Sequence, residues 1–136
     1  MKSRLLYRIS AVLIVLFAIG HSSEFPWSDS SWGVDPGPMR SSVQILGTSR
    51  SYWDFYVGFG LTVSVFLLLA AILAWELGGL SAQAMPLMRG TAWALPFCFA
   101  AVTVLNCVYF FVIPIVFSSA ITVCLFGAAA LSRRAA

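Results

Sequence analysis

The stretch from Thr91 to Leu131 runs for 41 residues without a single Asp, Glu, Lys, Arg or His. As one continuous helix it would be about 61 Å long, roughly twice the 30 Å hydrocarbon core of a bilayer. In water, an uncharged surface of this length would aggregate. We therefore expect the stretch to fold back inside a membrane as two helices, spanning about 91–111 and 115–131. Pro114 marks the expected break, because proline disrupts a helix interior.

Two more apolar stretches precede this one, and they predict transmembrane spans at about 5–22 and 55–76. The chain as a whole is 60% hydrophobic and only 10% charged, whereas a soluble domain carries about 25% charged residues. The sequence therefore predicts an all-α membrane protein. We expect a single domain over 1–136, a four-transmembrane-helix bundle with one long extracytoplasmic loop at 23–54.

The N-terminal stretch has a second interpretation. A basic start, an apolar middle and the small-x-small sequence Ala18-Ile19-Gly20 are also typical of a secretory signal peptide. Whether residues 1–20 form a retained span or a cleaved signal stays open at this stage.

The polar segment before the second span contains three local signals. Asp35-Pro36-Gly37-Pro38 predicts a turn. Met39, Val43 and Leu46 fall on one face of a helix, so we expect a short surface helix at 39–46 that Gly47 ends. Ser51-Tyr52-Trp53-Asp54 has the spacing of a capping box, with Ser51 as N-cap and Asp54 at N3.

The basic residues predict the orientation of the helices. With the N-terminus inside, six of the eight lie on the cytoplasmic side and two, Arg40 and Arg50, lie outside. This distribution obeys the positive-inside rule. We therefore expect a multi-pass membrane protein with both termini in the cytoplasm. The six cytoplasmic residues are Lys2, Arg4, Arg8, Arg89, Arg133 and Arg134.

Small residues spaced four apart predict where helices pack, because they allow backbones to approach closely in lipid. Such pairs occur in the second and fourth expected spans. They predict either contacts within the bundle or a dimer interface. The helix-packing candidates are Gly58, Gly60, Thr62, Ser64 and Ser118.

Asn106 is the most polar side chain inside any expected span. A buried amide must find partners in lipid. We expect an interhelical hydrogen bond to Ser64, Thr103 or Ser118, and the alternative is a contact with a substrate.

One group of polar and aromatic residues is expected at the outer rim of the bundle. His21 ends the first span, Glu24 follows three residues later, and Asp54 arrives at the same level. A histidine beside carboxylates can act as an acid–base or metal group, although a polar cluster that ties the loop to the helix ends is the alternative. The candidate outer-rim pocket consists of His21, Glu24, Arg50, Trp53, Asp54 and Tyr56.

The remaining sequence features predict little chemistry. The three cysteines, Cys98, Cys107 and Cys124, lie in apolar stretches without a C-x-x-C motif, and buried cysteine usually behaves as a small hydrophobe. The lack of charge within the spans argues against proton-coupled transport. We assign no catalytic residue, metal or cofactor. The expected partners are the lipid bilayer and another membrane protein or a second copy, with no nucleic acid.

The string Ser51-Tyr52-Trp53-Asp54-Phe55-Tyr56-Val57-Gly58-Phe59-Gly60, together with Gly20-His21, resembles families of small bacterial four-helix integral membrane proteins, DoxX-like in size and layout. This resemblance implies a fold but no established activity. Two functions remain from the sequence. One is a non-enzymatic packing, scaffold or complex subunit. The alternative is a membrane-embedded enzyme or lipophilic-ligand binder that uses the outer-rim pocket.

Overall fold

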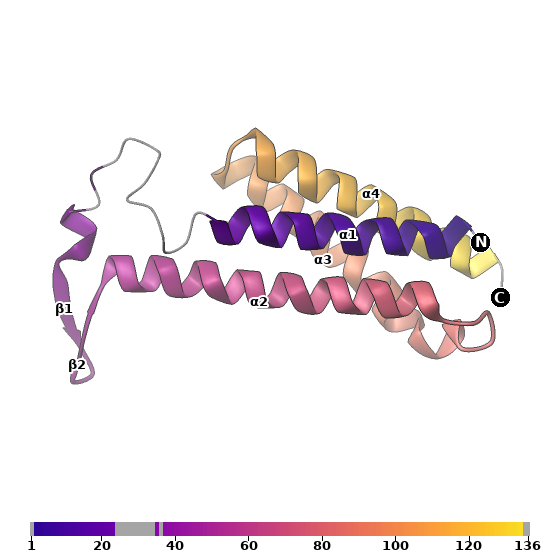
Figure 1. Ribbon diagram of the computed structural model, residues 1–136, viewed down its shortest axis with the longest axis horizontal. Helices are drawn as coiled ribbons and strands as arrows, with labels where there is room; N and C mark the ends of the chain where they lie inside the picture. Colours follow the sequence, from indigo (N-terminus) through magenta and orange to yellow (C-terminus); the bar gives the residue numbers. More distant parts are fainter. Residues whose placement is uncertain (1, 24–34, 36, 135–136) are drawn as a thin grey trace. The chain divides into compact units, whose positions relative to one another are not determined.

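The computed structural model describes residues 2–23, 35 and 37–134. Within this part of the chain, four α-helices are long and apolar enough to cross a membrane, as the sequence predicts. They are α1 (Lys2–Ser23), α2 (Tyr52–Gly79), α3 (Arg89–Tyr109) and α4 (Val112–Arg134) (Figure 1). The other elements are two short 3₁₀ helices, η1 (Gly37–Arg40) and η2 (Met85–Met88), and two strands, β1 (Ser42–Ile45) and β2 (Thr48–Ser51).

The chain divides into two compact units. Unit 1 contains residues 1–17 and 67–136, and unit 2 contains residues 18–66. Unit 1 therefore holds α3, α4, the N-terminal part of α1 and the C-terminal part of α2. Unit 2 holds the end of α1, the two strands and the start of α2.

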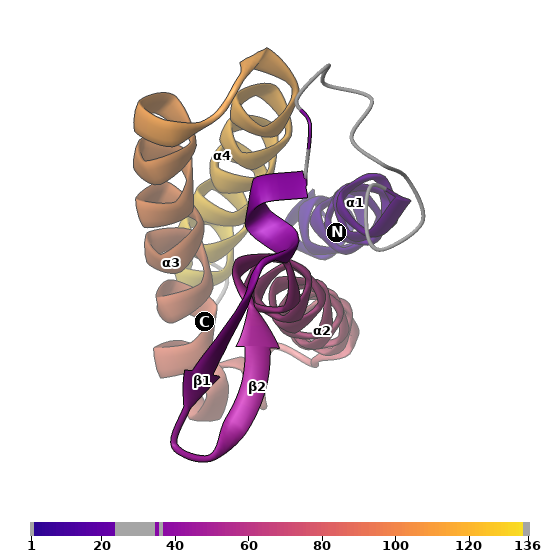
Figure 2. The ribbon, with the colours of Figure 1, turned by 90° about the vertical axis from the view of Figure 1, so that its left-hand side faces the viewer.

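The core of unit 1 is a stripe of buried residues on each helix, and most neighbours in a stripe are three or four residues apart. This spacing is the pattern of antiparallel helices that pack at shallow angles. On α4, for example, the stripe contains Ser118, Ile121, Leu125, Ala128 and Ser132. The α3 helix lies directly beside α4, as the view along the helices shows (Figure 2).

The helices expose many large apolar side chains and bury several polar ones. Serine and asparagine side chains are buried in the stripes, while large apolar residues such as Val65, Phe66 and Val123 are more than half exposed. A soluble protein would show the reverse arrangement. A lipid environment would accommodate the exposed apolar side chains, and hydrogen bonds within the protein would satisfy the buried polar ones.

Close contacts join α1 to α2 within unit 1. A Cβ atom added at Gly78 would lie only 3.3 Å from the Arg4 carbonyl oxygen and 3.3 Å from the Tyr7 Cβ. The Arg4 guanidinium donates a hydrogen bond to the Leu80 carbonyl, at 3.1 Å, just beyond the end of α2. Glycine at position 78 thus lets the two helices approach closely, and Arg4 satisfies a carbonyl that the helix leaves unpaired.

Contacts of α1 with α4 complete the packing of unit 1. The rings of Phe17 and Phe117 stack with centroids 5.7 Å apart. Further along the two helices, a Cβ added at Gly127 would lie 3.2 Å from the Leu6 Cδ1 atom. The stacked rings of Phe17 and Phe117, and the lack of a side chain at Gly127, therefore allow α1 to pack closely against α4.

The turn between α3 and α4 differs in position from the expected one. The third helix ends at Tyr109 and the fourth begins at Val112, so the chain reverses at Phe110–Phe111 rather than at Pro114. Pro114 lies in the first turn of α4, where a helix N–H has no intrahelical partner and proline is tolerated. The proline therefore helps to start the fourth helix.

The prediction of a surface helix at 39–46 is wrong. Only Gly37–Arg40 is helical, and residues 42–51 form an antiparallel hairpin in which Ile45 pairs with Thr48. The two-residue turn, Leu46-Gly47, has positive φ at both positions, 49° and 79°. This is the backbone geometry that tight hairpins favour, and Gly47 supplies it easily.

Candidate functional site

Within unit 2, His21 at the end of α1 contacts the backbone of α2. Its Nε2 atom lies 3.1 Å from the Gly60 carbonyl oxygen. One residue later, the Ser22 hydroxyl donates to the Ser64 hydroxyl at 2.9 Å, and Ser64 in turn donates to the Gly60 carbonyl at 3.2 Å. The first two of these hydrogen bonds tie the last turn of α1 to one turn of α2, and the third lies within that turn of α2.

Asp54 lies in the first turn of α2, closer to the start of that helix than Gly60, which His21 contacts. The Ser51 N–H donates to the Asp54 carboxylate at 2.7 Å, and the Asp54 N–H donates back to the Ser51 hydroxyl at 3.1 Å. This reciprocal pair is the capping box that the sequence predicts, and it is confirmed. His21 contacts α2 at Gly60, six residues or about 9 Å along the axis from Asp54, so the expectation that the two side chains lie at one level is wrong.

The other residues of the candidate outer-rim pocket make contacts within unit 2. The rings of Trp53 and Tyr56 lie 5.5 Å apart, and the Arg40 guanidinium lies 5.2 Å from the Trp53 ring centroid. Arg50 donates to the carbonyl of its neighbour Ser49. Glu24 lies outside the described residues. The contact of Arg40 with Trp53 joins η1 to the start of α2, whereas the Trp53–Tyr56 and Arg50–Ser49 contacts each lie within one element.

Asn106 makes the interhelical hydrogen bonds that its position predicts. Its amide donates to the Ser118 hydroxyl at 3.1 Å and to the Pro114 carbonyl at 3.2 Å. One turn away, the hydroxyls of Thr103 and Thr122 lie 3.2 Å apart. These polar groups join α3 to α4 in the apolar part of unit 1. Of the three hydrogen-bond partners that the sequence left open for Asn106, the structure shows Ser118.

The small residues of α2 lie on two different faces. Gly60 and Ser64 are buried, and both contact α1 as described above. Gly58 and Thr62 are exposed, and a Cβ added at Gly58 would meet no atom within 4 Å. The Thr62 hydroxyl donates to the Gly58 carbonyl at 2.8 Å, so it brings no unpaired donor to this face.

Unit 1 contains a basic cleft that the sequence did not predict as a site. It lies between the start of α3 and the end of α4, with a volume of about 360 Å³. The sequence identifies Arg89 and Arg133 only as residues that orient the helices. Their convergence depends on how α3 and α4 pack. The lining residues are Met85, Pro86, Arg89, Ala92, Trp93, Ala129, Ser132 and Arg133.

Across the part of the chain that the structure describes, no three His, Cys, Asp or Glu side chains are grouped closely enough to hold a metal ion. Comparison of the chain with protein-family models, curated proteins and solved structures gives no significant match. Any function must therefore be inferred from the residues themselves.

Proposed function

We propose that this chain is a multi-pass protein of the bacterial cytoplasmic membrane that acts as a non-enzymatic packing subunit. Both termini would lie in the cytoplasm, and the segment between α1 and α2 would lie outside. Four helices of membrane-spanning length and the six-to-two distribution of basic residues support this arrangement. The DoxX-like resemblance is compatible with the layout and stays a prediction.

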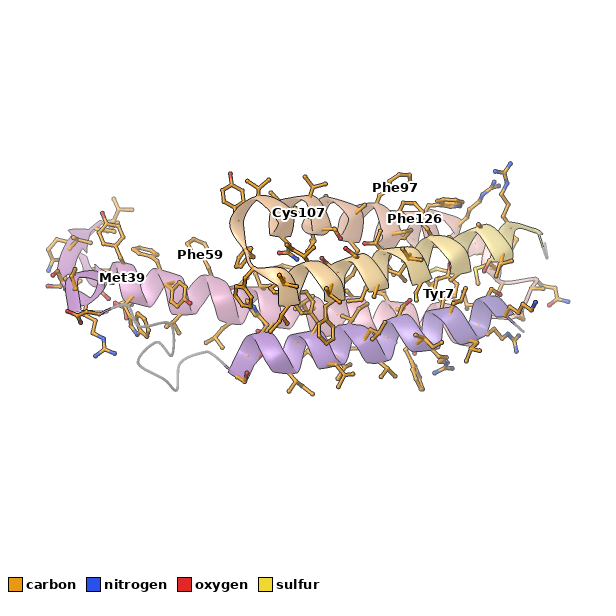
Figure 3. All side chains as sticks on the ribbon, turned by 90° about the horizontal axis from the view of Figure 1, so that it is seen from above. Tyr7, Met39, Phe59, Phe97, Cys107 and Phe126 are labelled. Carbon is orange, nitrogen blue, oxygen red and sulfur yellow. The ribbon has the colours of Figure 1, made fainter. Side chains whose placement is uncertain are left out.

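The observation that carries the packing role is the open face of α2 at Gly58 and Thr62. At 3.6 residues per turn, these two residues lie on roughly the opposite side of the helix from Gly60 and Ser64. The latter pair already binds α1, whereas nothing fills the notch at Gly58. The rings of Phe55 and Phe59 stack beside it with centroids 6.4 Å apart, and Phe59 projects from the helix (Figure 3).

A second copy of the chain is the partner that fits this face best. Two small residues four apart let identical helices cross closely on a two-fold axis, so that the same residues meet. The apolar rings beside the notch would pack against the partner helix. Because the Thr62 hydroxyl is already bonded, pairing would bury no unsatisfied polar group on this face.

Disulfide crosslinking in native membranes tests the self-association. In a variant with Cys98, Cys107 and Cys124 changed to Ala, Thr62→Cys should give a covalent dimer on mild oxidation. Ser64→Cys is the matched control, because this position is buried against α1. Equal crosslinking at both positions, or none at Thr62→Cys, contradicts a dimer through this face.

Labelling of single cysteines tests the orientation. In the same cysteine-free variant, Leu46→Cys in the hairpin turn and Leu87→Cys in η2 both replace highly exposed side chains. We expect a membrane-impermeant maleimide to label Leu46→Cys in intact cells and Leu87→Cys only after permeabilisation. Labelling of both from the same side contradicts the proposed topology.

The alternative function, an enzyme or lipophilic-ligand binder at the outer rim, makes a different prediction. It requires His21 and Asp54 to face a ligand, whereas their described contacts join elements of unit 2. Screening His21→Ala in cells separates the two functions. The alternative would be favoured if His21→Ala abolished the cellular activity of the protein while its level and its crosslinking at Thr62→Cys stayed normal.

A further inference from the structure

The basic cleft of unit 1 has two arginines that converge from different helices. Arg89 begins α3, and Arg133 lies in the last turn of α4, yet both line the same cavity. No acidic side chain contributes to the lining. Among the described residues, neither guanidinium has a carboxylate within ion-pair distance. Two arginines that line one cleft, with no acidic side chain in its lining, favour an anionic ligand.

The N-terminal end of α3 adds positive potential to the cleft. The N-cap residue of α3, Met88, makes no side-chain hydrogen bond to the first-turn N–H groups, which carry the positive end of the helix dipole.

One wall of the cleft continues into an apolar surface. Trp93 lines the cleft and contacts both Phe97 and Phe126, with ring centroids 6.2 Å apart in each case. Phe97 and Phe126 meet edge to face at 5.2 Å, side by side on α3 and α4 (Figure 3). Phe97 is 61% exposed. The cleft thus joins two arginines to an exposed aromatic strip through an indole ring, which suits a membrane interface.

We propose that this cleft binds the phosphate headgroup of an anionic phospholipid, with an acyl chain lying along Phe97 and Phe126. A basic pocket between transmembrane helices at the cytoplasmic side is suited to such a headgroup. A free phosphate ion would use the arginines but not the aromatic strip, which is why the lipid is the better occupant. The proposal rests on the proposed membrane insertion but not on self-association through α2.

Native mass spectrometry of the full-length protein in detergent tests the proposal. The protein would be titrated with phosphatidylglycerol or with phosphatidylcholine of the same acyl chains, and the bound lipid counted on the monomer peak. We expect one phosphatidylglycerol to bind clearly more tightly than phosphatidylcholine. Arg89→Gln/Arg133→Gln should weaken this binding roughly tenfold or more. Arg40→Gln/Arg50→Gln removes the same charge in unit 2 and should change it less than about twofold.

Two further arms separate the possible outcomes. Arg89→Lys/Arg133→Lys keeps the charge and should retain most of the binding, which makes a folding defect of the glutamine variant recognisable. Millimolar inorganic phosphate should not displace the lipid, and Phe97→Ala should weaken its binding. Equal affinity for the two lipids, equal loss in both double glutamine variants, or full displacement by phosphate overturns the proposal. Counting on the monomer keeps the result independent of whether the chain dimerises.

Discussion

The guanidinium carbon of Arg8 lies 3.5 Å from the centroid of the Trp75 ring, on the neighbouring helix of unit 1. This contact places a positive charge over an aromatic face, where the ring quadrupole attracts it. The Arg8 Nε also lies 3.2 Å from the position of a Cβ on Gly78. The side chain is thus held along α2, and its charge meets the indole near the end of that helix.

This contact predicts coupling between the two residues. Arg8→Gln and Trp75→Leu should each lower the free energy of unfolding by about 1 kcal/mol, because each removes the cation–π pair. The double variant should cost less than the sum of the two, since only one interaction is lost. Unfolding in detergent, monitored by far-UV circular dichroism for all four proteins of the cycle, measures this. Strict additivity would show that the residues do not interact.

The two adjacent glycines at the end of α2 should respond differently to alanine. At Gly78, a Cβ would meet the Arg4 carbonyl and the Tyr7 Cβ at 3.3 Å, and neither can move freely. Gly78→Ala should therefore destabilise unit 1 by about 1 kcal/mol or more, despite the higher helix propensity of alanine. At Gly79 the nearest atom is the flexible end of Arg8, at 3.5 Å, so Gly79→Ala should be neutral or slightly stabilising. The same melting temperature for both variants contradicts the close helix approach.

The hydrogen bonds of Asn106 should make a measurable contribution to stability. Asn106→Leu removes the donors to Ser118 and the Pro114 carbonyl and should cost about 1 kcal/mol, the size expected for polar contacts between transmembrane helices. Cys107→Leu is the control, because Cys107 lies next to Asn106 on α3 but is exposed (Figure 3). Unfolding by sodium dodecyl sulfate titration compares the two variants. A cost at Cys107 equal to that at Asn106 would mean that side-chain size, rather than hydrogen bonding, explains the loss.

The capping box predicts a local effect at the start of α2. Ser51→Ala removes the acceptor for the Asp54 N–H and should lower the free energy of unfolding by about 1 kcal/mol. Ser49→Ala, at an exposed position of the same strand, should have little effect. Hydrogen–deuterium exchange of the amides in the first turn of α2 would locate the change. Unchanged exchange at these amides in Ser51→Ala contradicts the role of the cap.

Some of this arrangement could be predicted because it depends on short-range or solvent effects. The uncharged run from Thr91 to Leu131 predicts paired membrane-spanning helices, since only hydrocarbon accommodates such a surface. Ser51 and Asp54 are three residues apart, so the reciprocal cap follows from local backbone geometry. The hairpin at 42–51 was missed because the spacing of Met39, Val43 and Leu46 also fits a helix, and cross-strand pairing decided between the two.

The sequence by itself determined that the described part of the chain forms four helices of membrane-spanning length, because an apolar run in lipid can satisfy its backbone polar groups only as a helix. Tertiary structure alone decided which of three partners Asn106 binds, which of two glycines, Gly58 or Gly60, faces outward, and that Arg89 and Arg133 share one cleft. These relationships join residues on different helices or different faces. Their geometry follows from how the helices rotate and cross, which side-chain packing sets.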